Sequence, residues 1–161
     1  MQNAPSALLL SQLHDAVLDV VAFINRPDRD ETLMREAQIK LDRALFPLLV
    51  LTERLGPISV VELAGRVGRD HSTVSRQIGK LVQLGLVERQ ASQSDGRQRE
   101  LRPTAWGRTV ARQIDEARER LTRRALSGWS EREITELARS LRRYADALAV
   151  SSSADGRGKT L

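Results

Sequence analysis

One stretch of sequence decides the fold: Asp70-His-Ser-Thr-Val-Ser-Arg-Gln-Ile-Gly-Lys-Leu-Val-Gln-Leu-Gly85. Val74, Ile78 and Leu81 recur at steps of four and three, which predicts a helix with these residues on one buried stripe. Asp70 suits the N-cap of that helix, and Gly85 stands where a helix can end in a left-handed residue. The opposite face holds short hydrogen-bonding groups and cations, which suit base edges and phosphates: Ser72, Thr73, Ser75, Arg76, Gln77 and Lys80.

The residues upstream predict a second, shorter helix. Ser59 and Glu62 have the spacing of a capping box, in which each side chain bonds a free amide of a helix start. The helix runs from Val60 to Val67, and Gly68-Arg69 makes the turn into the next helix. Its predicted buried residues are Val60, Leu63, Ala64 and Val67. Two short helices joined by a turn that contains Gly are typical of a helix-turn-helix.

The residues downstream predict a β-hairpin. Two strand-like runs, 86–90 and 98–102, are separated by a basic connection in which Asp95-Gly96 is a turn signal. Ile58 can add a short strand to this hairpin. A helix-turn-helix followed by a hairpin is a winged helix.

At these residues the sequence resembles the MarR (multiple antibiotic resistance regulator) family of transcription factors. Five motifs occur in the family's order: Val61-Glu-Leu-Ala64, Ser72-Thr-Val-Ser-Arg76, Leu84-Gly-Leu-Val-Glu-Arg89, Asp95-Gly-Arg97 and Thr104-Ala-Trp-Gly107. The resemblance implies a dimer that reads pseudo-palindromic DNA and inserts the wing arginine, Arg97, into the minor groove. Asp95 would hold the wing tip in shape by accepting hydrogen bonds. The step Arg102-Pro103 departs from the aliphatic residue that the family more often has, which we expect to alter the end of the second wing strand without affecting the resemblance.

The candidate DNA contacts divide between bases and phosphates. We predict that Arg76 and Gln77 reach bases, with Arg76 on a guanine O6/N7 edge. The other polar residues of the helix would divide between bases and phosphates: Ser72, Thr73, Ser75 and Lys80. Ser59 and its helix start offer free amides to a phosphate, and Arg99 would lie beside another. Arg76 and Lys80 also have a plainer interpretation as ordinary exposed residues, and for Arg99 the two interpretations are evenly balanced.

Composition and charge fit this interpretation. The 161 residues, 40% hydrophobic, suit one globular domain. Residues 57–110 hold nine basic and five acidic residues, a net charge of +4, whereas residues 1–56 hold six and eight, a net charge of −2. An arginine-rich genome that encodes an ordinary solvated surface would explain part of this asymmetry.

The sequence argues against several other classes of protein. Cysteine is absent, and the two histidines, His14 and His71, have no neighbouring ligand cluster, so we expect no thiol chemistry, no metal site and no cofactor. We find no phosphate-binding Gly-rich loop and no nucleophile with a partnered base, so we expect no enzyme. There is no N-terminal signal, and the longest apolar run, Leu45–Leu51, is too short to cross a bilayer. We therefore expect a cytoplasmic protein without a membrane partner.

The N-terminal third predicts helices with uncertain partners. From Ser6 to Ile24 the apolar residues form two neighbouring stripes, which indicates either a core helix of the monomer or a helix shared with a second subunit. Residues 25–31 are predicted as a loop and residues 32–39 as a helix. Asp42 would cap a helix that runs to Arg54 and bends at Pro47. The predicted buried residues of that segment are Leu45, Leu48, Leu49 and Leu55.

The C-terminal third predicts two more helices. Thr104 would cap a long helix that ends near residues 127–128, with an apolar seam that begins at Trp106, which we expect to pack in the core. Ser130 and Glu133 form a second capping box. The last helix has the seam of a coiled pair: Ile134, Leu137, Leu141, Tyr144 and Leu148. The tail from residue 150 is expected to be disordered.

Together these features predict a mainly α protein with a small β wing: a winged helix-turn-helix with N- and C-terminal dimerisation helices. The expected segments are an N-terminal dimerisation helix and loop (1–31), a DNA-binding region (32–103, with its recognition helix at about 71–84 and its wing at about 86–102), C-terminal dimerisation helices (104–149) and a tail (150–161). The expected partners are double-stranded DNA, a second copy of the chain and, from the resemblance, a small-molecule effector. The predicted function is a ligand-responsive repressor; the alternative is a winged-helix protein-interaction module without specific DNA binding.

Overall fold

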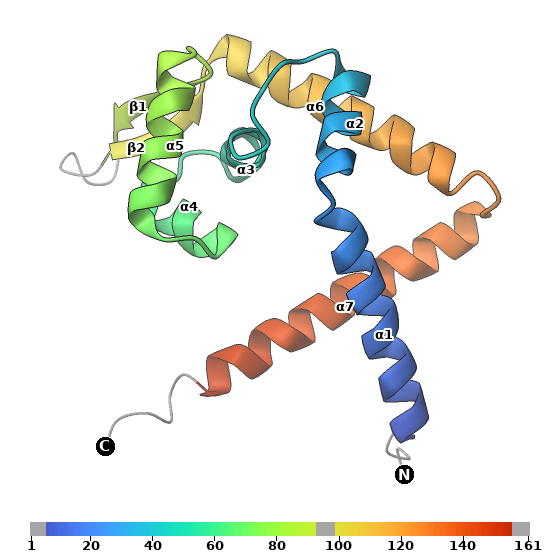
Figure 1. Cartoon of the computed structure of the whole chain (residues 1–161). Coiled ribbons are helices and arrows are strands. Elements are labelled where there is room, and N and C mark those ends of the chain that lie inside the picture. Colours follow the sequence, from blue (N-terminus) through green and yellow to red (C-terminus); the bar gives the residue numbers. More distant parts are fainter. Residues whose placement is uncertain (1–5, 93–98, 156–161) are drawn as a thin grey trace, which may run out of the picture. The chain divides into compact units, whose positions relative to one another are not determined.

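The computed structural model describes residues 6–92 and 99–155, and within them the chain is mainly helical (Figure 1). The helices are α1 (Ala7–Ile24), α2 (Pro27–Ala37), α3 (Phe46–Leu55), α4 (Val60–Val67), α5 (His71–Gln83), α6 (Ala105–Ala125) and α7 (Glu131–Asp155). Strands β1 (Val87–Ala91) and β2 (Arg99–Pro103) form a two-stranded sheet. The chain divides into two units, Met1–Arg120 and Leu121–Leu161. The predicted fold class is confirmed.

Helices α4 and α5 form the predicted helix-turn-helix. Helix α4 starts at the Ser59–Glu62 capping box, and its C-cap Gly68 has a φ of 63°. After α5 the chain turns at Gly85, whose φ of 68° lies in the left-handed region, as expected. The two ends of the recognition helix are therefore fixed by residues that can be identified from the sequence.

One hydrophobic core holds this region together. The side chains of the predicted α5 stripe are completely buried, and Leu63 from α4 is buried with them. Val60 and Val67, which we expected to be buried, are only half-buried. The largest buried side chains come from α3, α4, α5, β2 and α6: Leu48, Leu49, Leu63, Ile78, Leu81, Leu101 and Ile114. The recognition helix thus rests on residues from both sides of it in the sequence.

The wing is an antiparallel hairpin with a short third segment. Its register pairs Val87 with Pro103 and Ala91 with Arg99. Ile58 forms the predicted bridge to Leu101, whose backbone N–H donates to the Ile58 carbonyl at 2.8 Å. Pro103 occupies the last position of β2, where a residue without an N–H is tolerated. The departure at residues 102–103 therefore leaves the strand intact.

Helix α6 begins where the recognition segment ends. The Thr104 N–H donates to the Leu86 carbonyl at 3.0 Å, and the Thr104 hydroxyl donates to the Gly85 carbonyl at 2.6 Å. The same hydroxyl accepts the Gly107 N–H at 2.9 Å, so Thr104 caps α6 as predicted. Gly107 is buried, and a Cβ on it would lie 1.9 Å from the Leu86 carbonyl oxygen. This position therefore has room only for glycine.

The predicted loop at residues 25–31 is wrong, because α2 begins at Pro27. Proline at the first helical position has the φ that a helix needs and loses no hydrogen bond there. Asp28 and Asp30 in the first turn complement the helix dipole, and the Arg26 guanidinium bonds both oxygens of Asp28 at 2.8 and 3.1 Å. The boundary expected between residues 31 and 32 consequently falls inside α2.

The start of α3 also differs from the prediction. Asp42 caps a turn by accepting the Ala44 N–H at 2.7 Å, but α3 itself begins at Phe46. Pro47 lies in the first turn of that helix and so starts it instead of bending it. Leu55, expected to be buried, is 38% exposed at the end of the helix.

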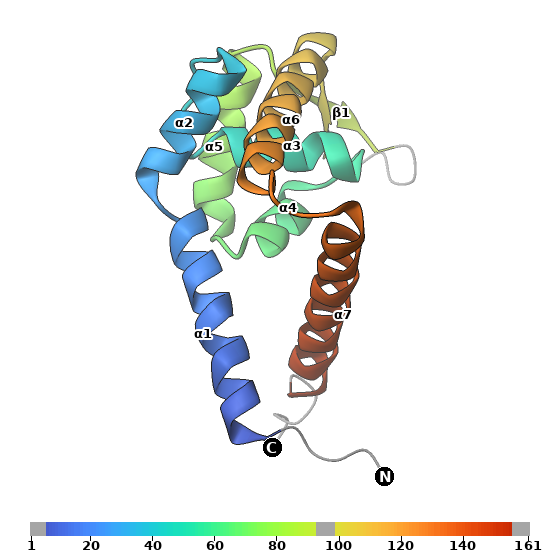
Figure 2. The same ribbon diagram turned by 90° about the vertical axis from the view of Figure 1, so that its right-hand side faces the viewer.

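Helix α1 projects away from α3, α4 and α5 in two views at right angles (Figures 1 and 2), and none of its residues is buried. Its length and composition alone would allow it to cross a membrane, with a mean hydropathy of 1.7. The length of the unbroken apolar runs in the sequence does not reveal this property. Asp15 and Asp19 lie near the middle of the helix, and each would cost about 2.5–3.5 kcal/mol at a bilayer centre. The apolar surface of α1 is therefore better suited to a protein partner.

The seam of α6 is buried at Val110, Ile114 and Ala117. The expectation that Trp106 packs in the core is wrong, because its side chain is 58% exposed. It stands one position before Gly107, which approaches the Leu86 backbone closely.

In the second unit, α7 starts at the predicted capping box, where the Ser130 N–H donates to Glu133 at 2.7 Å. The seam residues Leu137 and Leu141 are 38% and 53% exposed. The helix continues to Asp155, so the expectation of disorder from residue 150 is wrong for residues 150–155. A helix already formed adds further residues at little cost, because only its first turn is unfavourable to nucleate.

Candidate nucleic-acid interface

The recognition helix α5 begins at a carboxylate that accepts two hydrogen bonds. Asp70 Oδ1 accepts the Thr73 N–H at 2.8 Å and the Ser72 hydroxyl at 2.6 Å. The Ser72 hydroxyl and then the Thr73 side chain and amide hold the pKa of Asp70 well below its usual range. Asp70 is therefore an ionised N-cap at neutral pH.

The outer face of α5 carries a row of three exposed residues. Ser72, Arg76 and Lys80 are each one helical turn apart, so their side chains lie along the same line. Thr73, Ser75 and Gln77, beside that row, are half-buried. The structure thus brings together all six candidate residues of the helix and makes Ser72, Arg76 and Lys80 the most accessible of them.

Gln77 has a neighbour that the sequence analysis missed. The Arg69 guanidinium donates to Gln77 Oε1 at 3.5 Å, across the turn between α4 and α5. The sequence pattern alone indicates a turn residue at Arg69, although a cation just before a recognition helix is also a signal for phosphate contact. Its bond to Gln77 orients the amide, so that the Gln77 NH₂ group is left to donate.

Ser59 is more constrained than the sequence suggested. Its N–H and its hydroxyl both donate to Glu62 Oε2, at 3.1 and 2.9 Å, and its hydroxyl oxygen accepts the Glu62 N–H at 3.2 Å. These bonds, from the Ser59 amide first and then its hydroxyl, lower the pKa of Glu62. A phosphate at this helix start would have to use the amides of Val60 and Val61 in place of Ser59.

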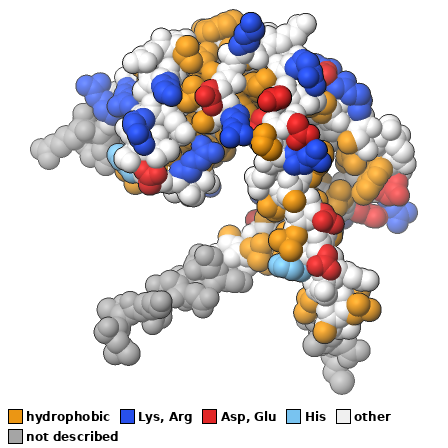
Figure 3. Space-filling view, in the orientation of Figure 1, with side chains coloured by type: hydrophobic (Ala, Val, Ile, Leu, Met, Phe, Trp, Pro, Cys, Tyr) orange, Lys and Arg blue, Asp and Glu red, His pale blue; other side chains and the backbone are white. Residues whose placement is uncertain are grey.

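The wing contributes Arg99, which is exposed at the start of β2. The predicted wing arginine Arg97 and the wing-structuring residue Asp95 lie outside the described residues. Behind Arg99, the Ser92 hydroxyl donates to Glu100 at 2.5 Å and joins the two strands. Lys and Arg side chains lie over the part of the molecule that carries α4, α5 and the sheet, and others lie over α6 (Figure 3). That distribution suits a polyanionic partner.

Lowering the pH should destabilise the two helix starts. Asp70 and Glu62 have folded-state pKa values below their usual ones, so the unfolded chain binds protons more readily. Their stabilisation is complete above the unfolded-state values of about 4 and is lost as the pH falls toward the folded-state values. We expect the free energy of unfolding in urea to fall between about pH 7 and about pH 3.

The matched control for this pH dependence is the double variant D70N/E62Q. Its amide oxygens can accept the same hydrogen bonds but do not titrate. It should therefore lose less stability than the wild type over the same interval. An equal loss in the two proteins would contradict the assignment.

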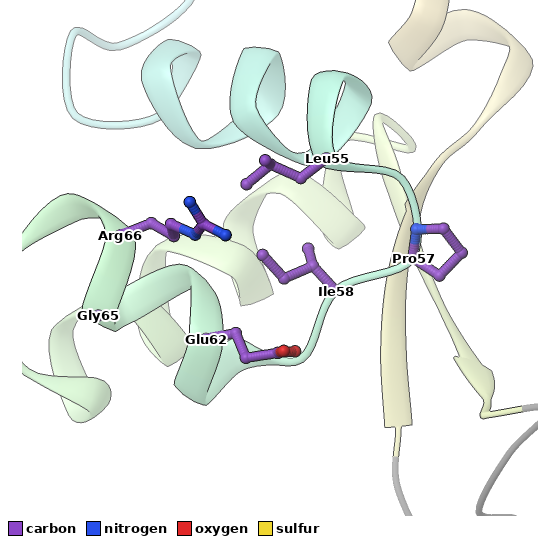
Figure 4. A pocket seen from close by; sticks show the side chains of 6 residues that line it. All are labelled: Leu55, Pro57, Ile58, Glu62, Gly65 and Arg66. Atoms are coloured by element: carbon purple, nitrogen blue, oxygen red, sulfur yellow. The ribbon is translucent and has the colours of Figure 1, made fainter. Parts of the chain in front are cut away.

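Among the cavities of the first unit, one of about 440 Å³ is lined by residues of α2 and of the α2–α3 connection. Two others lie against α4 or the end of α5. One, of about 300 Å³, is lined by Leu55, Pro57, Ile58, Glu62, Gly65 and Arg66. Figure 4 shows its side chains coming from α3, α4 and the connection between them. The Glu62 carboxylate is engaged by Ser59 in the capping box, and the charge of Arg66, also in that lining, contributes with those hydrogen bonds to lowering the pKa of Glu62.

The second cavity, of about 310 Å³, lies between the α2–α3 connection, the end of α5 and the start of α6. Most of its lining is apolar, including Leu84, Leu86 and the exposed Trp106. Lys40 is the one cation among its lining residues, beside Gln38 and Gln113. Within the described residues no group of three metal-ligating side chains occurs.

Known proteins resemble the chain in this region and in overall fold. Residues 40–98 match the model of the MarR family. A MarR family protein from Bacillus stearothermophilus has a TM-score of 0.77 at 19% identity, over 91% of this chain and 99% of that one. The transcriptional regulator BldR from Sulfolobus solfataricus has a TM-score of 0.69 at 22% identity, over 89% and 99%.

A structure solved with DNA is also similar. FabT from Streptococcus pneumoniae, in complex with DNA, has a TM-score of 0.64 at 17% identity, over 89% of this chain and 98% of that one. The sequence has no significant match among curated proteins. At these identities the solved structures establish the fold.

Proposed function

We propose that this chain is a sequence-specific DNA-binding regulator that acts as a homodimer. Its fold is that of MarR family transcriptional regulators, and its residues 40–98 match that family's model. The observation that carries this proposal is the exposed row Ser72, Arg76 and Lys80 on α5. The opposite face of the helix is completely buried, so the row is held rigidly toward solvent. A helix that presents hydroxyls and cations in this way fits the major groove.

The proposal is tested by selecting duplexes from a random-sequence library with the full chain. A regulator of this kind should enrich a pseudo-palindromic site with half-sites about one helical turn apart, because each subunit presents one recognition helix. Failure to enrich any sequence would favour the alternative, a winged-helix protein-interaction module without specific DNA binding.

The homodimer is supported by the apolar side chains that each unit leaves exposed, on α1 in the first unit and on α7 in the second. On α1 these side chains are 45–69% exposed at Leu8, Leu9, Leu10 and Leu13, and none of the helix is buried. On α7 the seam of Leu137, Leu141 and Leu148 is exposed as well. Exposed apolar surface on this scale marks a protein–protein interface. A second copy of the chain would cover it and set the distance between the two recognition helices.

Placing charge in that surface should separate the subunits. The wild type should sediment at about twice the 18.0 kDa mass of the chain, whereas L13E/L141E should sediment as a monomer and bind DNA more weakly, since a single half-site remains in contact. R139E is the control, because Arg139 is exposed on α7 and lies off the seam. Sedimentation of L13E/L141E as a dimer would contradict the proposed interface.

The second cavity is the best candidate for an effector site. Its apolar walls and the Lys40 ammonium suit a small aromatic carboxylate, and its volume of about 310 Å³ is in the range of small-molecule sites. Leu84 and Leu86 join the recognition helix to β1, so a ligand against them could shift α5 and lower its affinity for DNA. This is the basis on which we propose a ligand-responsive repressor in the cytoplasm.

Trp106 provides a direct probe of that cavity. In a Trp129→Phe variant the remaining tryptophan is Trp106, and benzoate should quench its fluorescence in a saturable way. Lys40→Ala should weaken that binding by about 10-fold, through loss of the charge-assisted contact. Arg43→Ala removes a nearby cation that does not line the cavity and should leave binding unchanged. Identical titrations in the Lys40 and Arg43 variants would contradict this site.

A further inference from the structure

The start of the recognition helix fixes the direction of one hydroxyl. The Ser72 hydroxyl donates to Asp70 Oδ1 at 2.6 Å, and Asp70 Oδ1 also accepts the Thr73 N–H at 2.8 Å. Both Asp70 and Ser72 are exposed, so the pair is open to a partner in the groove.

An ionised carboxylate has no proton to give. The low pKa of Asp70 keeps it ionised, so in the contact with Ser72 the hydroxyl must be the donor. A serine hydroxyl has one proton and two lone pairs. With its proton committed to Asp70, Ser72 can only accept hydrogen bonds from a further partner.

This constraint decides what Ser72 can contact on DNA. Phosphate oxygens are acceptors, so an acceptor-only hydroxyl gains nothing from them. In the major groove the donors are the adenine N6 and cytosine N4 amino groups, while guanine O6 and thymine O4 are acceptors. Ser72 is in the first turn of α5, the part of a recognition helix that meets base edges.

We propose that Asp70 is a specificity-determining residue: by taking the Ser72 proton, it makes Ser72 select adenine over guanine, or cytosine over thymine, at one position of each half-site. This inference rests on the proposed DNA-binding function. It changes the expected role of Ser72 from a contact shared between bases and phosphates to a base contact, and it gives Asp70 a role beyond capping the helix.

The experiment uses the site selected by the full-length wild type. Each adenine of the half-site is replaced in turn by purine, which lacks N6, and each cytosine by pyrimidin-2-one, which lacks N4. Binding is measured by fluorescence anisotropy. At one position of the half-site, the modified base should lower the affinity of the wild type about 2- to 10-fold more than it lowers the affinity of Ser72→Ala. This difference is the effect of the one hydrogen bond between Ser72 and the base. The comparison with Ser72→Ala cancels the effect of the modified base on duplex pairing.

Two substitutions at Asp70 separate specificity from capping. Asp70→Gly keeps a favoured N-cap residue but frees the Ser72 proton, so Ser72 can also donate to guanine O6 or thymine O4. The loss of affinity when that adenine is replaced by guanine, or that cytosine by thymine, should therefore shrink. Asp70→Asn should restore it, because the Thr73 N–H keeps the amide oxygen on the side where Oδ1 accepts from Ser72. A residue that only capped the helix would change affinity for all duplexes equally.

Two results would overturn the inference. One is an Asp70→Gly variant that keeps the wild-type discrimination of adenine from guanine, or of cytosine from thymine, at the Ser72 position. The other is a wild type in which no modified base has an effect that depends on Ser72. Failure of the proposed function would look different, because the wild type would then select no duplex at all.

Discussion

Replacing Arg76 with alanine should weaken binding to the selected operator by about 10- to 100-fold. Arg76 is exposed in the middle of the row on α5, one turn after Ser72. A guanidinium can donate two parallel hydrogen bonds to guanine O6 and N7, and no other side chain of the row has that geometry. Fluorescence anisotropy on the operator and on a scrambled duplex measures both the affinity and the specificity ratio.

A matched control removes the same charge elsewhere. Arg112 is exposed on α6, away from the recognition helix in sequence, so R112A should lower affinity for both duplexes only slightly. Lys80→Ala should weaken binding to both duplexes about equally and reduce the dependence of log affinity on log salt concentration. Adding R97A to R76A should abolish operator binding while the dimer remains. Equal behaviour of R76A and R112A would contradict the assignment of the reading face.

The second large effect concerns stability. Gly107→Ala should lower the free energy of unfolding by about 2 kcal/mol or more, since the new Cβ would lie 1.9 Å from the Leu86 carbonyl oxygen, which accepts the Thr104 N–H. For a chain of this size that corresponds to a decrease in Tm of about 4–8 °C. Thermal unfolding followed by circular dichroism checks it.

Gly65→Ala is the control for this substitution. Gly65 is also inside a helix, but a Cβ there would meet no other atom within 4 Å. The substitution should therefore stabilise the chain by about 0.4–1 kcal/mol, because alanine restricts the unfolded chain. A Gly107→Ala variant as stable as the wild type would show that α6 does not approach Leu86 this closely.

The parts of the fold that were predictable from the sequence are those set by local chemistry. The stripe at Val74, Ile78 and Leu81, the capping boxes at Ser59 and Ser130, and the left-handed Gly85 were all identified from spacing. Each depends on residues within a few positions of one another, so the sequence pattern is sufficient.

The wrong predictions of helix boundaries arose at prolines, because proline is common both in loops or bends and in the first turn of a helix. Proline was interpreted as a loop residue at Pro27 and as a bend at Pro47, yet both start helices. Periodicity assigns Trp106 to the core, but it is Gly107, one position later, that packs against the Leu86 backbone, and Trp106 is 58% exposed. The glycine of the motif Thr104-Ala-Trp-Gly107 indicates a close approach at that position. The sequence pattern does not show that the residue it approaches is Leu86, which lies far away in sequence.

The candidate site was predictable as a set of residues, but its hydrogen bonds were not. The polar face of α5 follows from periodicity alone. The bonds of Ser72 to Asp70, and of Gln77 to Arg69, depend on side-chain conformations and distances that spacing does not give. These bonds decide which groups remain free to contact DNA.

The most direct test of the central claim is anisotropy with the DNA immediately upstream of the chain's own gene, with a scrambled duplex as control and salt titrated for both. A sequence-specific regulator should bind its site about 10³-fold or more tightly than the scrambled duplex, with log affinity falling linearly in log salt concentration for each. Absence of binding to either duplex at low salt would contradict the assignment of α5 as a DNA-reading helix.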